Sequence, residues 1–129
     1  MTTKQPYFTV IIVAFNSGDY LDECINALEK QIFKDFEIII FDNGTKNGSS
    51  HSISSSSLNI SVIKSTSNKG FAVGNNAAAK DAKGGWLVLL NSDAIPEKDW
   101  LSEIFKAVCR YPDIVIFGST QINYHHPKV

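Results

Sequence analysis

The sequence predicts an α/β fold, a doubly wound and mostly parallel sheet with helices on both faces. Apolar runs rich in β-branched residues alternate with segments whose apolar residues recur every three or four positions. The runs are apolar throughout, which is typical of strands buried on both faces. Turn residues separate the segments. Regular alternation of strand and helix produces a parallel sheet flanked by helices.

The apolar runs predict strands at residues 7–15, 36–41, 60–63, 86–90 and 114–117. Helical periodicity predicts amphipathic helices over 20–32, over the alanine-rich 72–82, and after Pro96, which suits a first helical turn. The serine-rich segment 47–58 fits either a poor helix or a loop, and we expect the poor helix.

Composition limits the classes of function. The chain has 129 residues, 43% of them apolar, enough for one core, and a formal charge of −1. A nucleic-acid binder needs a basic excess, so we expect no nucleic-acid partner. No apolar run approaches the roughly 20 residues of a membrane span, and residues 1–6 contain no signal-peptide core. We expect one cytoplasmic domain over residues 1–129.

Cysteine and histidine spacing gives no metal site. Cys24 and Cys109 fall in predicted helices, and we expect two buried free thiols rather than a disulfide. His51, His125 and His126 have no partner at metal-ligand spacing, so we expect them on the surface.

Small polar or acidic residues follow the first, second and fourth predicted strands. They are Asn16, Asp42, Asn43, Gly44, Asn91, Ser92 and Asp93. Carboxyl ends of parallel strands meet at one edge, where open sheets bind ligands near the reversal of strand order. Such residues also simply terminate strands, so the pattern alone leaves a structural role open.

Two carboxylates in this set have the chemistry of a nucleotide site. Asp93 can bind a hard divalent cation that bridges a diphosphate. Asp42 can accept a hydrogen bond from a base imide or a ribose hydroxyl, and Gly44 permits close backbone approach. Phe15 can flank a base, although an aromatic residue at a strand end more often belongs to the core.

The loop that precedes the alanine-rich helix is a second candidate. Free N–H groups of Lys69 and Gly70 before a helix suit a phosphate or a ribose. The Gly70 and Gly74 pair is neither a dinucleotide-binding fingerprint nor a Walker loop. We expect Gly74 to let the helix pack closely on the sheet.

Four blocks, in order and spacing, resemble family 2 glycosyltransferases of the rhamnosyltransferase-type branch. They are TVIIVAFN (9–16), FDNGT (41–45), NKGFAVGNN (68–76) and LLNSDA (89–94). In that branch N-x-D replaces D-x-D. The resemblance extends from Thr9 to about Ser119.

The resemblance implies a GT-A fold, an inverting mechanism, a UDP- or dTDP-linked sugar donor and a Mg²⁺ or Mn²⁺ ion. It assigns Ala14 and Phe15 to the base pocket, Asp42 to the base, Lys69, Gly70 and Asn75 to the ribose or sugar, and Asp93 to the metal. The other residues expected at the donor site are Asn16, Gly44, Asn91 and Ser92. Asn91 stands where many relatives have the first aspartate, which removes a negative charge near the metal.

The resemblance also implies a segment that this chain lacks, one that supplies the acceptor site and a general base. We therefore expect a donor and metal site only, with no catalytic residue and no activity alone. The implied acceptor is a carbohydrate or a lipid-linked hydroxyl in cell-envelope polysaccharide synthesis, reached at the inner face of the membrane. A homo-oligomer could pair through a sheet edge near 114–117.

Two other functions fit an α/β chain of this length. A sugar nucleotidyltransferase would carry a basic, glycine-rich loop after its first strand, and Asn16 to Asp19 has no basic residue. A non-catalytic nucleotide-binding module fits the same fold, and only measurements of metal and nucleotide binding would separate it from the donor-binding part of an enzyme.

Overall fold

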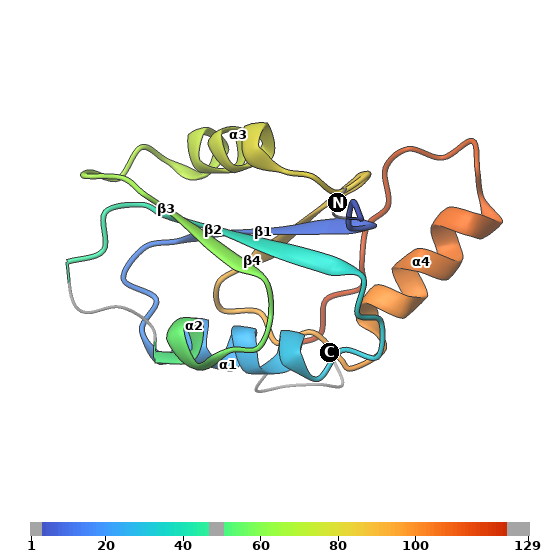
Figure 1. Cartoon of the computed structure of the whole chain (residues 1–129), viewed down its shortest axis with the longest axis horizontal. Coiled ribbons are helices and arrows are strands. Elements are labelled where there is room, and N and C mark those ends of the chain that lie inside the picture. Colours follow the sequence, from blue (N-terminus) through green and yellow to red (C-terminus); the bar gives the residue numbers. More distant parts are fainter. Residues whose placement is uncertain (1–3, 47–50, 124–129) are drawn as a thin grey trace.

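The computed structural model describes residues 4–46 and 51–123 (Figure 1). Strands and helices alternate along the chain in the order β1 (Phe8–Ala14), α1 (Asp19–Glu29), β2 (Phe36–Asp42), α2 (His51–Ser55), β3 (Ile60–Lys64), α3 (Phe71–Asp81), β4 (Trp86–Asn91) and α4 (Trp100–Arg110). Four of the five predicted strands and all the predicted helices are therefore confirmed, the serine-rich segment as a short helix.

The four strands form one parallel sheet in the order β3-β2-β1-β4. The chain moves outward from β1 to β2 and β3, and then crosses to the other side of β1 for β4. Helix α3 covers one face of the sheet, and α1 and α2 cover the other (Figure 1). The predicted doubly wound architecture is confirmed, and the strand order reverses between β1 and β4.

The predicted fifth strand is wrong. Residues 114–120 have no regular secondary structure, and Val115 and Ile116 are 77% and 84% exposed. A β-branched run becomes a strand only where a neighbouring backbone accepts its hydrogen bonds, and the described residues offer none here. Within these residues the sheet edges are β3 and β4, so the edge predicted near 114–117 does not exist. Homo-oligomerisation stays a prediction.

The larger core lies between the sheet and α1. Alternate residues of β1, namely Phe8, Val10 and Ile12, pack against Ile25 and Leu28 of α1. On the opposite face α3 approaches very closely at a glycine. A Cβ atom at Gly74 would lie 3.0 Å from the side chains of Val13 and Phe41. The close helix–sheet packing expected of Gly74 is confirmed.

A buried polar network closes the amino-terminal end of the sheet. Glu37 Oε1 accepts hydrogen bonds from Thr9 Oγ1 and from the Lys83 N–H, both at 2.7 Å. Thr9 Oγ1 in turn accepts from the Gly84 N–H at 2.8 Å. A Cβ atom at Gly84 would lie 2.4 Å from the Thr9 backbone nitrogen. The turn before β4 therefore sits directly against β1.

A buried amide fixes α4 to the end of α1. Gln31 is fully buried, and its Nε2 donates to the carbonyls of Glu97 (2.7 Å) and Ala27 (3.3 Å). Its Oε1 accepts from the Leu101 N–H at 3.0 Å. Leu101 is one of the two buried residues of α4, together with Val108. None of the described helices is long and apolar enough to cross a bilayer.

The two cysteines differ in exposure. Both are free thiols, as predicted, but only Cys24 is buried, whereas Cys109 is exposed. Cys109 lies near the end of α4 and is exposed, so its expected burial is wrong. Burial, and secondarily the negative charge of Asp93, raises the pKa of Cys24 to about 12.

We therefore expect one thiol of the native chain to react with a thiol reagent at pH 8. At equal pH a thiol with a pKa of about 12 has about a thousandth of the thiolate of a thiol with the ordinary pKa of 9.0. Because the thiolate is the reactive form, Cys24 should react at least a thousandfold more slowly than such an ordinary thiol. Time-resolved labelling of the Cys109→Ser variant measures this rate. Unfolded in urea, the same variant should take up one label per chain, at Cys24. Fast labelling without urea would contradict the burial of Cys24.

Candidate functional site

The loops that follow β1 and β2 lie at the carboxyl end of the sheet and hold each other through Asn16. The side-chain oxygen of Asn16 accepts a hydrogen bond from the Lys46 N–H at 3.1 Å, and the backbone N–H of Asn16 donates to Thr45 Oγ1 at 3.2 Å. Asn16 has a φ of +49°, an uncommon conformation that asparagine tolerates better than most residues. Asn16 therefore shapes this edge, and its side-chain oxygen is already engaged.

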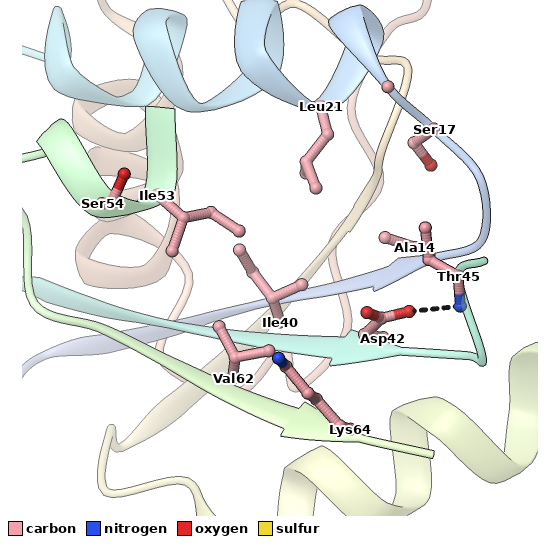
Figure 2. Close-up of a pocket in the computed structure, with 11 residues that line it drawn as sticks. Ala14, Ser17, Leu21, Ile40, Asp42, Thr45, Ile53, Ser54, Val62 and Lys64 are labelled. Carbon is pink, nitrogen blue, oxygen red and sulfur yellow. Dashed lines mark hydrogen bonds between the residues drawn. The ribbon is translucent and has the colours of Figure 1, made fainter. Parts of the chain in front are cut away.

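Asp42 ends β2 with its carboxylate partly engaged. Its Oδ1 accepts from the Thr45 N–H at 2.8 Å, which leaves Oδ2 as the oxygen with no hydrogen bond to Thr45 (Figure 2). Gly44 has a φ of +89°, and a Cβ atom there would lie 3.0 Å from the Ser67 backbone. The group that approaches Gly44 closely here is the chain's own loop, and its approach to a ligand stays a prediction.

Asp42 lines a pocket of about 180 Å³ between the carboxyl end of the sheet and helices α1 and α2 (Figure 2). Its apolar wall is formed by Leu21, Ile40, Ile53 and Val62. Its polar and small groups come from Ala14, Ser17, Gly18, Asp42, Thr45, Ser54 and Lys64. Of the predicted site residues, Ala14 and Asp42 line this pocket, and the others do not.

Lys64 is a pocket residue that sequence reasoning missed. Lys64 ends β3 and pairs with Asp42 at the end of β2. Each of these two strand ends therefore places a charged side chain in the same pocket. A lysine directly after an apolar strand at the carboxyl edge was a usable signal. The pocket thus combines a carboxylate, an ammonium group and an apolar wall, a combination suited to a planar heterocycle with polar edges.

The loop before α3 does not offer the free N–H groups expected of it. The Lys69 N–H donates to Asn43 Oδ1 at 2.7 Å, and the Gly70 N–H donates to Asn68 Oδ1 at 2.9 Å. Two side-chain amides thus occupy these donors before any ligand arrives, which corrects that expectation. The Lys69 side chain itself is exposed.

Two other residues predicted to contact a ligand, Phe15 and Asn75, lie outside this pocket. Asn75 is buried, and its Nδ2 donates to the Phe71 carbonyl at 3.0 Å within α3. Phe15 is 45% exposed beyond the end of β1, so its ring is available to a ligand outside the pocket.

The end of β4 adjoins the loop after β1, across the point where the strand order reverses. Ser17 Oγ donates to Ser92 Oγ at 2.8 Å, and Cys24 Sγ donates to the Asn91 carbonyl at 3.8 Å. Asn91 and Asp93 are both exposed. Over residues 4–46 and 51–123, no three acidic, cysteine or histidine side chains gather into a metal cluster. Asp93 therefore offers a single carboxylate at this edge.

Known proteins share this sequence and this arrangement. The family model described as "Glycosyl transferase family 2" matches residues 9–128. Glycosyltransferase AglE of Haloferax volcanii is 22% identical over 129 residues, which cover 96% of this chain and 42% of AglE. The uncharacterized glycosyltransferase YfnE of Bacillus subtilis is 31% identical over 113 residues, 85% of this chain and 29% of YfnE.

A solved structure has the same fold. Residues 1–349 of S. aureus TarS, in complex with UDP, superpose with a TM-score of 0.76 at 25% identity, over 88% of this chain and 38% of that one. The fold is therefore GT-A. This chain spans less than half the length of each of these relatives. Since the family model matches nearly all of its residues, the chain belongs to glycosyl transferase family 2.

Proposed function

We propose that this chain is the donor-binding part of an inverting glycosyltransferase that uses a nucleoside-diphosphate sugar. One observation carries the proposal. The pocket with Asp42 and Lys64 opens at the same sheet edge as Asp93, beside the reversal of strand order where open parallel sheets bind nucleotides. Family membership favours glycosyl transfer over nucleotidyl transfer.

The pocket chemistry favours a uracil or thymine base, hence a UDP- or dTDP-linked donor. Their imide presents one N–H between two carbonyl oxygens. Asp42 Oδ2 can accept from that N–H, since Oδ1 is held by Thr45, and Lys64 can donate to a neighbouring carbonyl. The apolar wall suits the ring face. TarS is structurally similar and was solved with UDP, which supports this assignment.

The diphosphate would lie toward the end of β4, and Asp93 would share a Mg²⁺ or Mn²⁺ ion with it. Hard cations of this kind take six or more oxygen ligands in most protein sites. Asp93 alone supplies too few, and the Ser92 hydroxyl already pairs with Ser17. The residues therefore fit a cation that arrives with the diphosphate, whose charge it would neutralise as the sugar leaves.

The remaining parts of the reaction belong outside this chain in our proposal. The relatives are more than twice as long, which supports a separate segment for the acceptor site and for the general base that deprotonates its hydroxyl. The acceptor would be a carbohydrate or a lipid-linked sugar of the cell envelope, reached from the cytoplasmic side.

Calorimetric titration of the chain with UDP, dTDP and GDP, each with and without Mn²⁺, tests this function. We expect metal-dependent binding of UDP or dTDP, and its loss in Asp93→Ala. The matched control is Asp81→Ala, which removes an exposed carboxylate at the far end of α3 and should keep wild-type affinity. Equal affinity in wild type and Asp93→Ala would refute the metal role. Absence of binding to all three nucleotides would refute the donor site in this chain.

A further inference from the structure

Asn43, directly after β2, connects three parts of the carboxyl edge through one buried residue. Its backbone N–H donates to the Ala14 carbonyl at the end of β1, at 2.7 Å. Its side chain contacts three consecutive residues of the loop before α3. Nδ2 donates to Asn68 Oδ1 (2.9 Å) and to the Gly70 carbonyl (3.3 Å), and Oδ1 accepts from the Lys69 N–H (2.7 Å). Asn43 is only 3% exposed.

The loop that Asn43 holds has little else to fix it. Residues 68–73 are all exposed. Gly70 has a φ of +89°, and a Cβ atom there would meet nothing within 4 Å, so packing does not impose this conformation. Helix α3 also begins without a side-chain cap. Hydrogen bonds to a buried amide are therefore what set the path of the backbone at Lys69.

Only an amide satisfies all of these partners. The Lys69 N–H needs an acceptor, whereas Asn68 Oδ1 and the Gly70 carbonyl both need a donor. An aspartate would keep the first bond and set an oxygen against the other two oxygens. A leucine would remove all three bonds and leave the Lys69 N–H without its acceptor, whereas Asn68 Oδ1 and the Gly70 carbonyl would keep only their bonds from the Gly70 and Gly74 N–H groups.

We propose that Asn43 is a positioning residue for donor binding. It sets where Lys69 stands relative to Asp42, its own neighbour in the chain, so that the base and the ribose or sugar meet their contacts together. Asn43 itself is covered by the loop and touches no ligand. This inference rests on the proposed function and takes Lys69 as the contact to the ribose or sugar that the family resemblance implies.

The test uses Asn43→Asp and Asn43→Ala, with and without Lys69→Ala. We expect each Asn43 variant to lower UDP affinity about tenfold or more, equivalent to about 1.4 kcal/mol. If Asn43 acts through Lys69, the losses will not add, and the double variant will bind about as weakly as Lys69→Ala alone. In ligand-free Asn43→Ala, the Lys69 amide should also exchange hydrogen faster. In Asn43→Asp, which keeps the acceptor, that amide should stay protected.

The control is Gln31→Ala, which removes a similarly buried amide with three hydrogen bonds, to Ala27, Glu97 and Leu101. It should lower stability and leave UDP affinity and Lys69 exchange unchanged. Additive losses, or wild-type affinity in Asn43→Asp, would overturn the positioning role while the donor site stands. Loss of affinity in Gln31→Ala matching that in Asn43→Ala would also overturn it, as a general effect of stability. If the wild-type chain binds no nucleotide, the proposed function fails and this inference fails with it.

Discussion

Replacing Gly84 by alanine should destabilise the chain by about 3 kcal/mol or more, a large share of the roughly 5–15 kcal/mol that stabilises a typical domain. The added Cβ atom would lie 2.4 Å from the Thr9 nitrogen and 2.6 Å from the Phe8 carbonyl carbon. Both are backbone atoms of β1, an interior strand, and they cannot rotate away as the tip of a side chain can. Relief requires β4 to move off β1.

That displacement would also break the hydrogen bonds that the same turn makes. The Gly84 N–H donates to Thr9 Oγ1, and the adjacent Lys83 N–H donates to the buried Glu37 carboxylate. Separation would leave these groups without partners in the interior, which adds to the steric cost. Urea denaturation monitored by circular dichroism measures the loss as a lower midpoint.

Gly85→Ala is the matched control for this prediction. It makes the same chemical change one position later, where the nearest atom to the added Cβ is the Tyr7 carbonyl oxygen at 3.9 Å. We expect its free energy of unfolding to stay within about 0.5 kcal/mol of that of wild type. Similar midpoints for the Gly84 and Gly85 variants would show that the turn does not pack against β1 as described.

Replacing Asp42 by asparagine should lower UDP affinity about a hundredfold, equivalent to about 2.7 kcal/mol, and should raise the relative affinity for CDP. The Thr45 N–H needs an acceptor, so the asparagine carbonyl oxygen takes the place of Oδ1. The amide NH₂ then faces the pocket. A donor there opposes the uracil N3–H and instead matches cytosine, whose N3 is an acceptor. Competition titrations of UDP and CDP against the variant and wild type measure this change in the ratio of the two affinities.

Asp35→Asn makes the same substitution at the other end of β2, where the carboxylate forms an exposed ion pair with Lys4 at 3.5 Å. It should bind both nucleotides as wild type does. If Asp42→Asn keeps its wild-type preference for UDP over CDP, then Asp42 does not contact the base. The melting temperature of Asp42→Asn should remain near that of wild type, because the Thr45 hydrogen bond is retained.

The sequence was sufficient for features that depend on local pattern. Apolar runs predicted β1 to β4, and the spacing of apolar residues predicted α1, α3 and α4. The run at 114–117 failed because strand formation needs a neighbouring backbone, which no local pattern records. The predicted burial of Cys109 failed for a similar reason, since the burial of a helix residue depends on how far neighbouring elements cover it.

The candidate site was predictable in outline and not in its hydrogen bonds. Alternation of strand and helix placed the ends of β1, β2 and β4 at one edge, and there the structure brings Ala14, Asp42 and Ser92 together with Ser17. Lys64 was missed because its approach to Asp42 depends on the β2–β3 register. The engaged N–H groups of Lys69 and Gly70 were missed because their acceptors lie on other residues. His125 and His126, and the side chain of His51, lie outside the described residues.

The strand order has a consequence for how the molecule assembles in time. Strand β1 pairs with β2, which follows it after one helix, but also with β4, which comes after one further strand and two further helices. Contacts between distant parts of a chain form more slowly, because closing a longer loop costs more entropy. The unit β1–β2–β3 with its pocket can therefore form early, while β4 docks last. The edge that carries Asp93 is thus the last part of the sheet to form, after the pocket that contains Asp42.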